Sequence, residues 1–222
     1  MKLTIHKTPA APSLNGEWDL PCWSPSETLK VDHFRVESSN HHPITEVKTL
    51  YCPNGLHLIF RVQDRFVRSI QTTLNSPVCT DSCVEFFVQP QEDKGYFNFE
   101  VNCGGTLHAS YVEDCTRTAS GFAKCSLLSQ SSAKWIGISH SMPNIVEPEV
   151  EQPTTWINQL FIPFDVFAEY VGELGSISGQ VWRANFYKCG DKTSHPHWAS
   201  WAPVRKLDFH DPTSFGSLQF GS

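Results

Sequence analysis

The clearest pattern in the chain is an alternation of apolar and polar residues between positions 81 and 111. One set of alternate residues is apolar: Val84, Phe86, Val88, Phe97, Phe99, Val101 and Cys103. The residues between them mix carboxylates, amides and aromatic rings: Glu85, Phe87, Gln89, Tyr96, Asn98, Glu100 and Asn102. Because side chains alternate between the two faces of a strand, this predicts strands at residues 83–89 and 96–103, with one face buried against a second layer. The other face is polar enough to hold a ligand such as a sugar.

Similar short runs recur along the chain and are separated by turn signals such as Pro-Asn-Gly at residues 53–55. The other predicted strands are residues 3–7, 46–52, 56–64, 106–112, 135–139, 155–162, 181–189 and 217–220. One helix is predicted, at residues 163–170, because Phe164, Phe167 and Val171 have helical spacing and Gly172 would end it. Two longer segments, residues 113–134 and 141–153, are expected to be loops.

Many short strands and one short helix favour an all-β fold. We expect an antiparallel two-sheet β-sandwich of the jelly-roll or immunoglobulin-like kind. No repeat, low-complexity tract or change in composition divides the 222 residues. A single domain over residues 1–222 is therefore the simplest organisation.

Composition narrows the classes of function. Hydrophobic residues make up 40% and aromatic residues 12%, which does not fit a disordered chain. The net charge is −6 and no basic patch is visible, which argues against nucleic acid as a partner. The N-terminus has no apolar run long enough for a signal peptide or a membrane span, so no membrane partner is expected. We expect a cytoplasmic protein if Met1 is the native start, and a secreted or periplasmic one otherwise.

The eight cysteines are expected to be free thiols. An even number would suit disulfides in a secreted protein, but several cysteines occupy predicted strand positions. Cys103, for example, belongs to the apolar face, where a thiol packs as a small hydrophobic group. No C-x-x-C pair is present.

A third strand, residues 181–189, repeats the two-face pattern, with Ala184 and Phe186 on its apolar side. If it lies near the first two, one sheet face collects a set of carboxylates, amides and a guanidinium: Glu85, Glu100, Asn102, Arg183 and Asn185. Sugar hydroxyls require donors and acceptors that converge and are held rigidly. The same pattern also fits an antiparallel sheet that simply shows a polar face to water. Both interpretations stay open from the sequence.

Aromatic and histidine residues gather near the C-terminus. Trp198 and Trp201 lie three positions apart, close to His195, His197 and His210. Aromatic rings in loops offer flat apolar faces for sugar rings, but they could equally close an open end of the sandwich. The pair His195 and His197 could bind a metal in an extended segment, although no third ligand is fixed by spacing.

Catalysis is the weaker alternative. No G-x-S-x-G, Gly-rich phosphate loop or H-E-x-x-H motif is present, so we assign no catalytic residue. Glu85 and Glu100 could serve as the carboxylate pair of a glycosidase if their separation were suitable. Nothing in the sequence sets that separation, and each could instead pair with a basic residue across strands.

Together these motifs resemble the family 9 carbohydrate-binding modules and their relatives. The resemblance runs from about Leu14 to Phe220 and is clearest at Asp81–Leu107 and Val181–Phe220. The motifs that carry it are T-D-S-C-V-E-F-F (80–87), G-Y-F-N-F-E-V-N (95–102), W-R-A-N-F-Y (182–187), W-A-S-W-A-P (198–203) and F-H-D-P-T-S-F-G-S-L-Q-F (209–220). It implies a two-sheet antiparallel sandwich, with structural calcium in some members. It also implies a site in which two tryptophans clamp a sugar, typically the reducing end of a glycan.

The chain departs from this family pattern at three positions. By position, the two clamp tryptophans correspond to Cys79 and Phe209, and a family arginine corresponds to Glu100. Glu85 and Asn102 match polar contacts of the family, and Asn185 lies on a strand near that site. The fold therefore transfers better than the sugar clamp.

We expect non-catalytic carbohydrate binding, of a mono- or oligosaccharide and potentially its reducing end. The expected site is the polar sheet face described above under an aromatic roof: Trp198, Trp201, Phe209 and His210. No cofactor is assigned from the sequence, and the resemblance allows structural calcium. Two alternatives stay open: a hydrolase of small sugars or glycosides that uses Glu85 and Glu100, and a protein-interaction or scaffold domain that has lost sugar binding.

Overall fold

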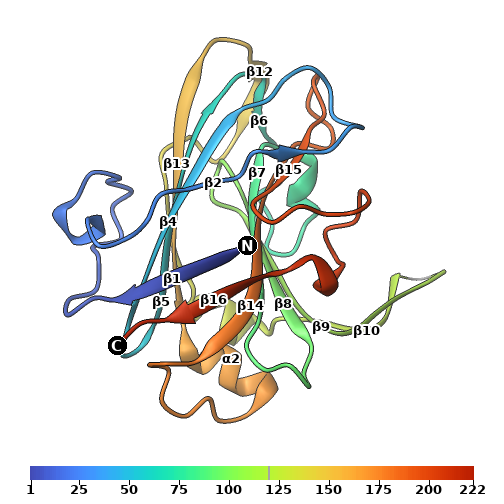
Figure 1. Cartoon of the computed structure of the whole chain (residues 1–222). Helices are drawn as coiled ribbons and strands as arrows, with labels where there is room; N and C mark the ends of the chain where they lie inside the picture. The colour runs from blue at the N-terminus through green and yellow to red at the C-terminus, as the bar shows by residue number, and fades with distance from the viewer. Residues whose placement is uncertain (120) are drawn as a thin grey trace.

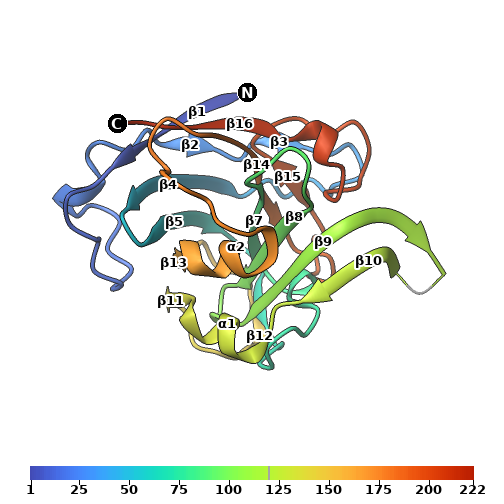
Figure 2. The same cartoon turned by 90° about the horizontal axis from the view of Figure 1, so that it is seen from below.

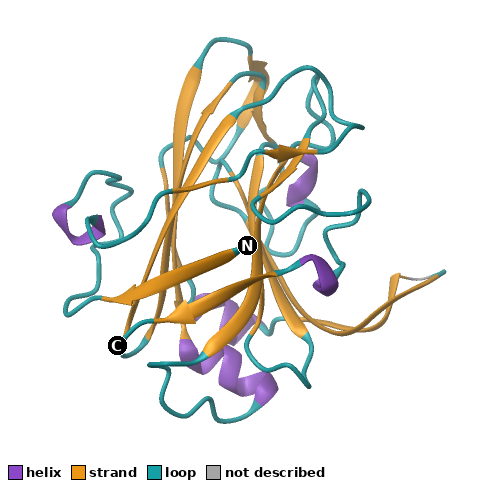
Figure 3. Cartoon of the chain, viewed as in Figure 1, coloured by secondary structure: helices purple, strands orange, loops and turns teal. Residues whose placement is uncertain are grey.

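The computed structural model describes residues 1–119 and 121–222, and most of its regular structure is β-strand (Figures 1 and 3). The strands are β1 (Lys2–Lys7), β2 (Leu29–Lys30), β3 (His33–Phe34), β4 (Ile44–Cys52), β5 (Gly55–Asp64), β6 (Val67–Ser69), β7 (Cys83–Gln89), β8 (Tyr96–Asn102), β9 (Leu107–Thr118), β10 (Gly121–Leu127), β11 (Gly137–His140), β12 (Val146–Val150), β13 (Thr154–Pro163), β14 (Val181–Cys189), β15 (Trp198–Ser200) and β16 (Gly216–Phe220). The helices of the described part are α1 (Gln130–Trp135) and α2 (Phe164–Val171).

The strands form two packed layers joined through β1, which gives a sandwich-like fold (Figure 2). One layer has the order β10-β9-β8-β7-β14-β16, and the other has the order β4-β5-β13-β11. Strand β1 pairs in parallel with β16 through Lys2–Ile5 and in parallel with β4 through His6–Lys7. The two layers are therefore one continuous large sheet, and β6 pairs with β12 in a small separate sheet. These parallel pairings of β1 correct the expectation of a wholly antiparallel sandwich.

The predicted apolar face lies in the core between the layers. All seven residues of the apolar set belong to one large buried cluster, together with residues of the facing layer such as Phe60 and Trp156. Helix α2 covers this core from one end, and its Phe167 ring lies 5.0 Å from Phe97 and 5.4 Å from Trp182 between centroids. The helix ends at Gly172, which has a φ of +86° that residues with a side chain rarely adopt. The predicted position of the helix is therefore confirmed.

The expectations of a single helix and of two long loops are wrong. Residues 113–134 contain the end of β9, all of β10 and all but the last residue of helix α1, and residues 141–153 contain β12. Beyond Val112, β9 and β10 are largely exposed on both faces, so they lack the alternation that would have signalled strands. Ser120, which belongs to the same expected loop, lies outside the described residues. Both helices are short, and none in the described part is long and apolar enough to cross a membrane.

A buried network of charged and polar side chains links the two layers. Lys188 of β14 is fully buried, and its Nζ lies 3.5 Å from Asp64 Oδ2 at the end of β5. His41 Nε2 lies 2.7 Å from Asp64 Oδ1, and Trp156 Nε1 donates to Asp64 Oδ2 at 3.0 Å. Burial opposes ionisation of Asp64, but the charge of Lys188 and the hydrogen bonds from His41 and Trp156 outweigh it. The pKa of Asp64 is therefore held well below its ordinary value.

His197 also belongs to this network, and its contacts bear on whether His195 and His197 could bind a metal together. Burial and the adjacent Lys188 charge lower the pKa of His197 to about 3, so its ring is neutral. Its Nε2 accepts from Lys188 Nζ at 2.7 Å, and its Nδ1 donates to the carbonyl oxygen of His195 at 2.8 Å. Both ring nitrogens are thus engaged within the protein, which leaves no nitrogen of His197 for a metal.

A second buried histidine, His57 of β5, predicts a change in acid stability. It is 3% exposed, its Nδ1 has no hydrogen-bond partner in the described structure, and burial lowers its pKa to about 4. Unfolded histidine takes up a proton near pH 6.5, as is usual for this residue. As the pH falls from 6.5 toward 4, only the unfolded chain gains this proton, so the folded state loses stability.

We expect His57→Leu to reduce this loss by on the order of 2 kcal/mol between pH 7 and pH 4.5. The measurement is the difference in unfolding free energy between the two pH values, from urea titrations of the variant and the wild type. Exposed His6→Leu is the control and should leave that difference unchanged. An identical pH dependence in His57→Leu and wild type would contradict the prediction.

Candidate functional site

The polar residues predicted from the sequence lie on the outer face of β7, β8 and β14. Strand β7 lies between the other two, and Glu85 is in register with Glu100 of β8 and Tyr187 of β14. The C-terminal segment, residues 201–215, covers part of this face. Phe209 stacks on Tyr187 with 4.0 Å between ring centroids, and Phe215 packs in the same apolar cluster.

A pocket of about 280 Å³ lies between this face and the surrounding segments. Its lining residues come from the turn before β7, from β7, β8, β9, β14 and β15, from the loop after β14 and from the C-terminal segment: Cys79, Glu85, Glu100, Arg117, Cys189, Asp191, Trp198, Leu207, Asp208, Phe209 and His210. A second hollow shares Arg117, Asp208 and His210 with it. The pocket thus combines carboxyl groups, aromatic rings and thiols.

Glu85 and Glu100 lie directly opposite each other on the neighbouring strands β7 and β8, and both are almost fully buried, at 3% and 7% exposure. Cys189 Sγ donates to Glu85 Oε1 at 3.0 Å, and Asn98 Nδ2 donates to Glu100 Oε1 at 2.7 Å. Burial and the neighbouring Glu100 carboxyl raise the pKa of Glu85 well above its ordinary value. Burial also raises the pKa of Glu100, although His108 and Asn98 oppose it. The pair retains protons more firmly than exposed carboxyls do, and it can therefore both donate and accept hydrogen bonds.

The aromatic groups of the pocket are fixed by their own contacts. Trp198 Nε1 donates to Asp191 Oδ1 at 2.7 Å, and the stacking on Tyr187 holds the ring of Phe209. Burial lowers the pKa of His210 to about 4, so this ring is neutral at physiological pH. Rigid side chains of this kind can offer apolar faces to a ligand without first paying for their own ordering.

Five of the nine predicted site residues meet in this pocket: Glu85, Glu100, Trp198, Phe209 and His210. Three polar residues of the set do not line the pocket, and their side chains form hydrogen bonds within the protein instead. Asn102 donates to Asp81 Oδ2 at 2.9 Å, and Asn185 exchanges two hydrogen bonds with the backbone of Ala202. Arg183 donates to carbonyl oxygens of the C-terminal segment. The period-two pattern predicts which residues share a face of the sheet, but it carries no information about which segment covers that face.

Trp201, expected in the aromatic roof, lies in the core instead. It is 2% exposed, and its ring centroid lies 5.7 Å from that of Phe186, which belongs to the apolar side of β14. The ring also packs so closely on Gly216 that a Cβ there would lie 2.5 Å from it. Of the two tryptophans in this motif, only Trp198 borders the pocket.

Several lining residues were not predicted. Cys189 has the same strand parity as Asn185 and Tyr187, so the alternation of β14 contained the signal that could have identified it. Arg117 belongs to the β9–β10 hairpin, and Asp191 to the turn after β14. For these two, the sequence offers no pattern that places them beside Glu85, because their position depends on tertiary folding.

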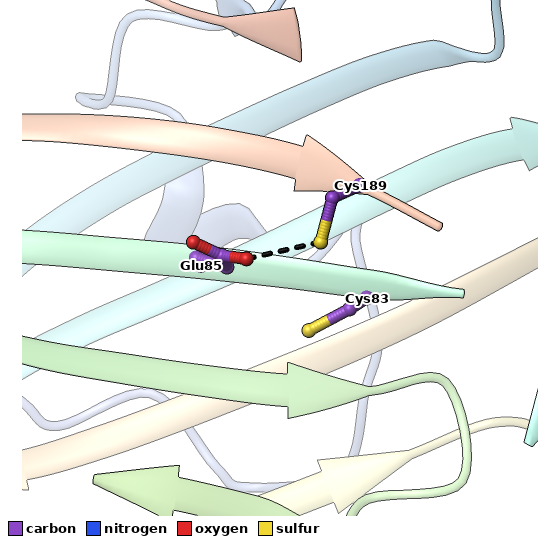
Figure 4. Close-up of side chains that lie close together, drawn as sticks. All are labelled: Cys83, Glu85 and Cys189. Atoms are coloured by element: carbon purple, nitrogen blue, oxygen red, sulfur yellow. Dashed lines mark hydrogen bonds between the residues drawn. The ribbon is translucent and has the colours of Figure 1, made fainter. Parts of the chain in front are cut away.

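One group of potential metal ligands also lies at this pocket. Within residues 1–119 and 121–222, Cys83, Glu85 and Cys189 are the one set of three ligating side chains whose donor atoms lie within 4.8 Å of one another (Figure 4). Calcium takes six to eight oxygen ligands, whereas this set offers two sulfur atoms. The set therefore does not fit the structural calcium that the family resemblance implies. All eight cysteines of the protein are free thiols.

Comparisons with known proteins agree with this architecture. A crystal structure from Bacteroides uniformis, described as that of a proposed carbohydrate-binding protein, is 28% identical with a TM-score of 0.82 and covers 99% of this chain and 98% of its own. A family 9 carbohydrate-binding module from Caldicellulosiruptor kristjanssonii, 12% identical, has been solved with cellotriose and with glucose. Those structures give TM-scores of 0.66 and 0.61, cover 100% and 99% of this chain, and cover 94% and 96% of their own.

No curated protein matches the chain in sequence. The model of carbohydrate-binding family 9, in contrast, matches residues 25–220, which is most of the chain. The chain therefore belongs to carbohydrate-binding family 9.

Proposed function

We propose that the protein binds a carbohydrate in the pocket beside Glu85 and Glu100, without catalysis. The observation that carries this proposal is the pairing of two buried carboxyl groups with the rings of Trp198 and Phe209 in one pocket. Such carboxyls can satisfy sugar hydroxyls, and the rings can pack against the C–H faces of the sugar. Membership of the family supports the proposal, as do the structural relatives that hold cellotriose and glucose.

The size of the pocket favours a small ligand. Its volume of about 280 Å³ lies just below the usual range for small-molecule sites, which begins at about 300 Å³. We propose that it takes a monosaccharide or one terminal unit of an oligosaccharide, such as its reducing end. Cys79 and Phe209, at the positions of the family's two clamp tryptophans, both border the pocket. Because a thiol and a phenyl ring present less flat surface than two indoles, we expect weaker binding than a double-tryptophan clamp provides.

Isothermal titration calorimetry with glucose, cellotriose and a panel of other mono- and disaccharides tests this proposal. For the best ligand, we expect Trp198→Ala and Glu100→Gln each to lower the affinity about 10-fold or more, because each removes a contact worth roughly 1–3 kcal/mol. Glu92→Gln, an exposed carboxyl outside the pocket, is the matched control and should bind like the wild type. Unchanged affinity in both pocket variants would refute the proposed site.

The glycosidase alternative keeps one supporting observation, the facing pair of Glu85 and Glu100 with raised pKa values. A glycosidase requires a carboxylic acid that stays protonated to act on the leaving group. Hydrolysis of a chromogenic glycoside that disappears in Glu85→Gln would favour this alternative. Binding of the same sugars with no turnover would favour the non-catalytic function.

A further inference from the structure

The thiols beneath the sugar pocket are brought together by strand geometry. Cys83 and Glu85 are two residues apart on β7, so their side chains share one face of the sheet. Cys189 of β14 is the direct register partner of Cys83, which places it on the same face. Figure 4 shows the three side chains converging on one region, with the hydrogen bond from Cys189 to Glu85.

We propose that Cys83, Glu85 and Cys189 form a site for a thiophilic divalent cation of the zinc class, with both Sγ atoms and one carboxylate oxygen of Glu85 as ligands. Zinc binds thiolate sulfur at about 2.3 Å and carboxylate oxygen at about 2.0–2.2 Å, commonly with four ligands in a tetrahedron. Ligand atoms of such an ion lie roughly 3.5–3.8 Å apart, by that geometry. The donor atoms here all lie within 4.8 Å of one another, so movements of about 1 Å would bring them into position.

The chemistry of the donors selects the class of ion. Two sulfur ligands favour zinc and similar soft or borderline ions over calcium and magnesium, which prefer oxygen. Cys189 donates to Glu85 Oε1 at 3.0 Å and lies 3.7 Å from the carbonyl oxygen of Cys79, and Cys83 makes a long contact of 3.6 Å with the Val84 carbonyl oxygen. The ion would replace these contacts, and the protons of the two thiols and of the Glu85 carboxyl would pass to solvent.

The site also has an entry path and an open position. Cys83, Glu85 and Cys189 are each at most 3% exposed, but Glu85 and Cys189 border the pocket, so an ion can reach them from it. Three protein ligands leave the fourth position of a tetrahedron free for water or another group from the pocket. Cys79 borders the same pocket and is the nearest further thiol that the lining offers.

Cobalt(II) titration of the reduced, metal-free full chain tests the proposal, because cobalt reports its ligands by absorbance and requires no sugar. We expect uptake of one equivalent, with thiolate-to-cobalt charge-transfer absorption in the near ultraviolet and the visible bands of a tetrahedral ion. One equivalent of zinc should then remove these bands. Failure of the wild-type protein to develop the charge-transfer bands would overturn the proposal, whatever the outcome of the sugar titrations.

Variants locate the site. Cys83→Ser and Cys189→Ser should each lower zinc affinity by about 100-fold or more, since a direct ligand contributes more than an outer partner, whose loss costs about 10–100-fold. Cys125→Ser, which changes an exposed thiol away from this site, should keep wild-type affinity and spectrum. Circular dichroism confirms that each variant is folded. Unchanged charge-transfer bands in folded Cys189→Ser would place the bound ion elsewhere and refute the site.

Discussion

Lys188→Met is expected to lower the free energy of unfolding by about 3–5 kcal/mol, as is usual when one partner of a buried ion pair is removed. Methionine fills a similar volume, so the loss arises mainly from electrostatics. The variant leaves the Asp64 carboxylate buried without its cation, and it also removes the donor to His197. Urea titration at pH 7, followed by tryptophan fluorescence, measures this loss as a lower midpoint.

Two further variants separate the ion pair from general effects of the substitution. Lys124→Met breaks an exposed pair with Glu113, 2.7 Å apart, and should change stability by no more than about 1 kcal/mol. The double variant Lys188→Met/Asp64→Asn should recover part of the loss, because no unpaired buried charge remains. If Lys188→Met were as mild as Lys124→Met, the assignment of Lys188 as a buried charge that compensates Asp64 would be wrong.

Trp201→Ala is expected to destabilise the protein by about 3–5 kcal/mol, the usual cost of removing a large aromatic side chain from a core. Trp201 is 2% exposed and packs against Phe186 and Gly216, so the truncation leaves a cavity that the surrounding strands can close only in part. Thermal and urea unfolding measure the loss of stability. Sugar affinity of the folded variant should equal that of the wild type.

Trp198→Ala provides the matched comparison because it removes the same side chain three residues earlier. Trp198 is half-buried and borders the pocket, so its truncation should cost less stability and more affinity than that of Trp201. Trp201→Ala should therefore show the larger loss of stability, and Trp198→Ala the larger loss of sugar affinity. Loss of sugar binding in folded Trp201→Ala, with unaltered stability, would contradict the core position of this ring.

Much of the strand framework follows from alternation alone. Residues 83–89 and 181–189 were predicted with the bounds that the structure shows, because β7 has one uniformly apolar face and the apolar face of β14 is interrupted only by Lys188. The helix at Phe164–Val171 was predictable for a similar reason, since its apolar spacing and Gly172 agree. Local signals of this kind are sufficient to predict an element when one of its faces is buried and apolar and the other has a different polarity.

The lining of the candidate pocket was only partly predictable, because its composition depends on contacts that the local pattern does not encode. Glu85 and Glu100 were identified by their strand parity, and the structure places them opposite each other. Asn102 and Asn185 have the same parity, yet their amides bind other parts of the chain rather than facing the pocket. Arg117 lies in a hairpin whose exposed strands have no apolar rhythm, so no periodicity pointed to it.

The pairing of β1 with β16 has a consequence for how the chain is made. Leu3 and Ile5 are buried, but their in-register partners Leu218 and Phe220 lie more than 200 residues further along the chain and leave the ribosome long after them. Until β16 has been synthesised, β1 can pair only with β4, through His6 and Lys7. Contacts between such distant parts of a chain slow folding and prolong the exposure of unpaired strand edges. Closure of the sandwich must therefore wait until β16 has been synthesised, and the edge of β1 stays unpaired until then.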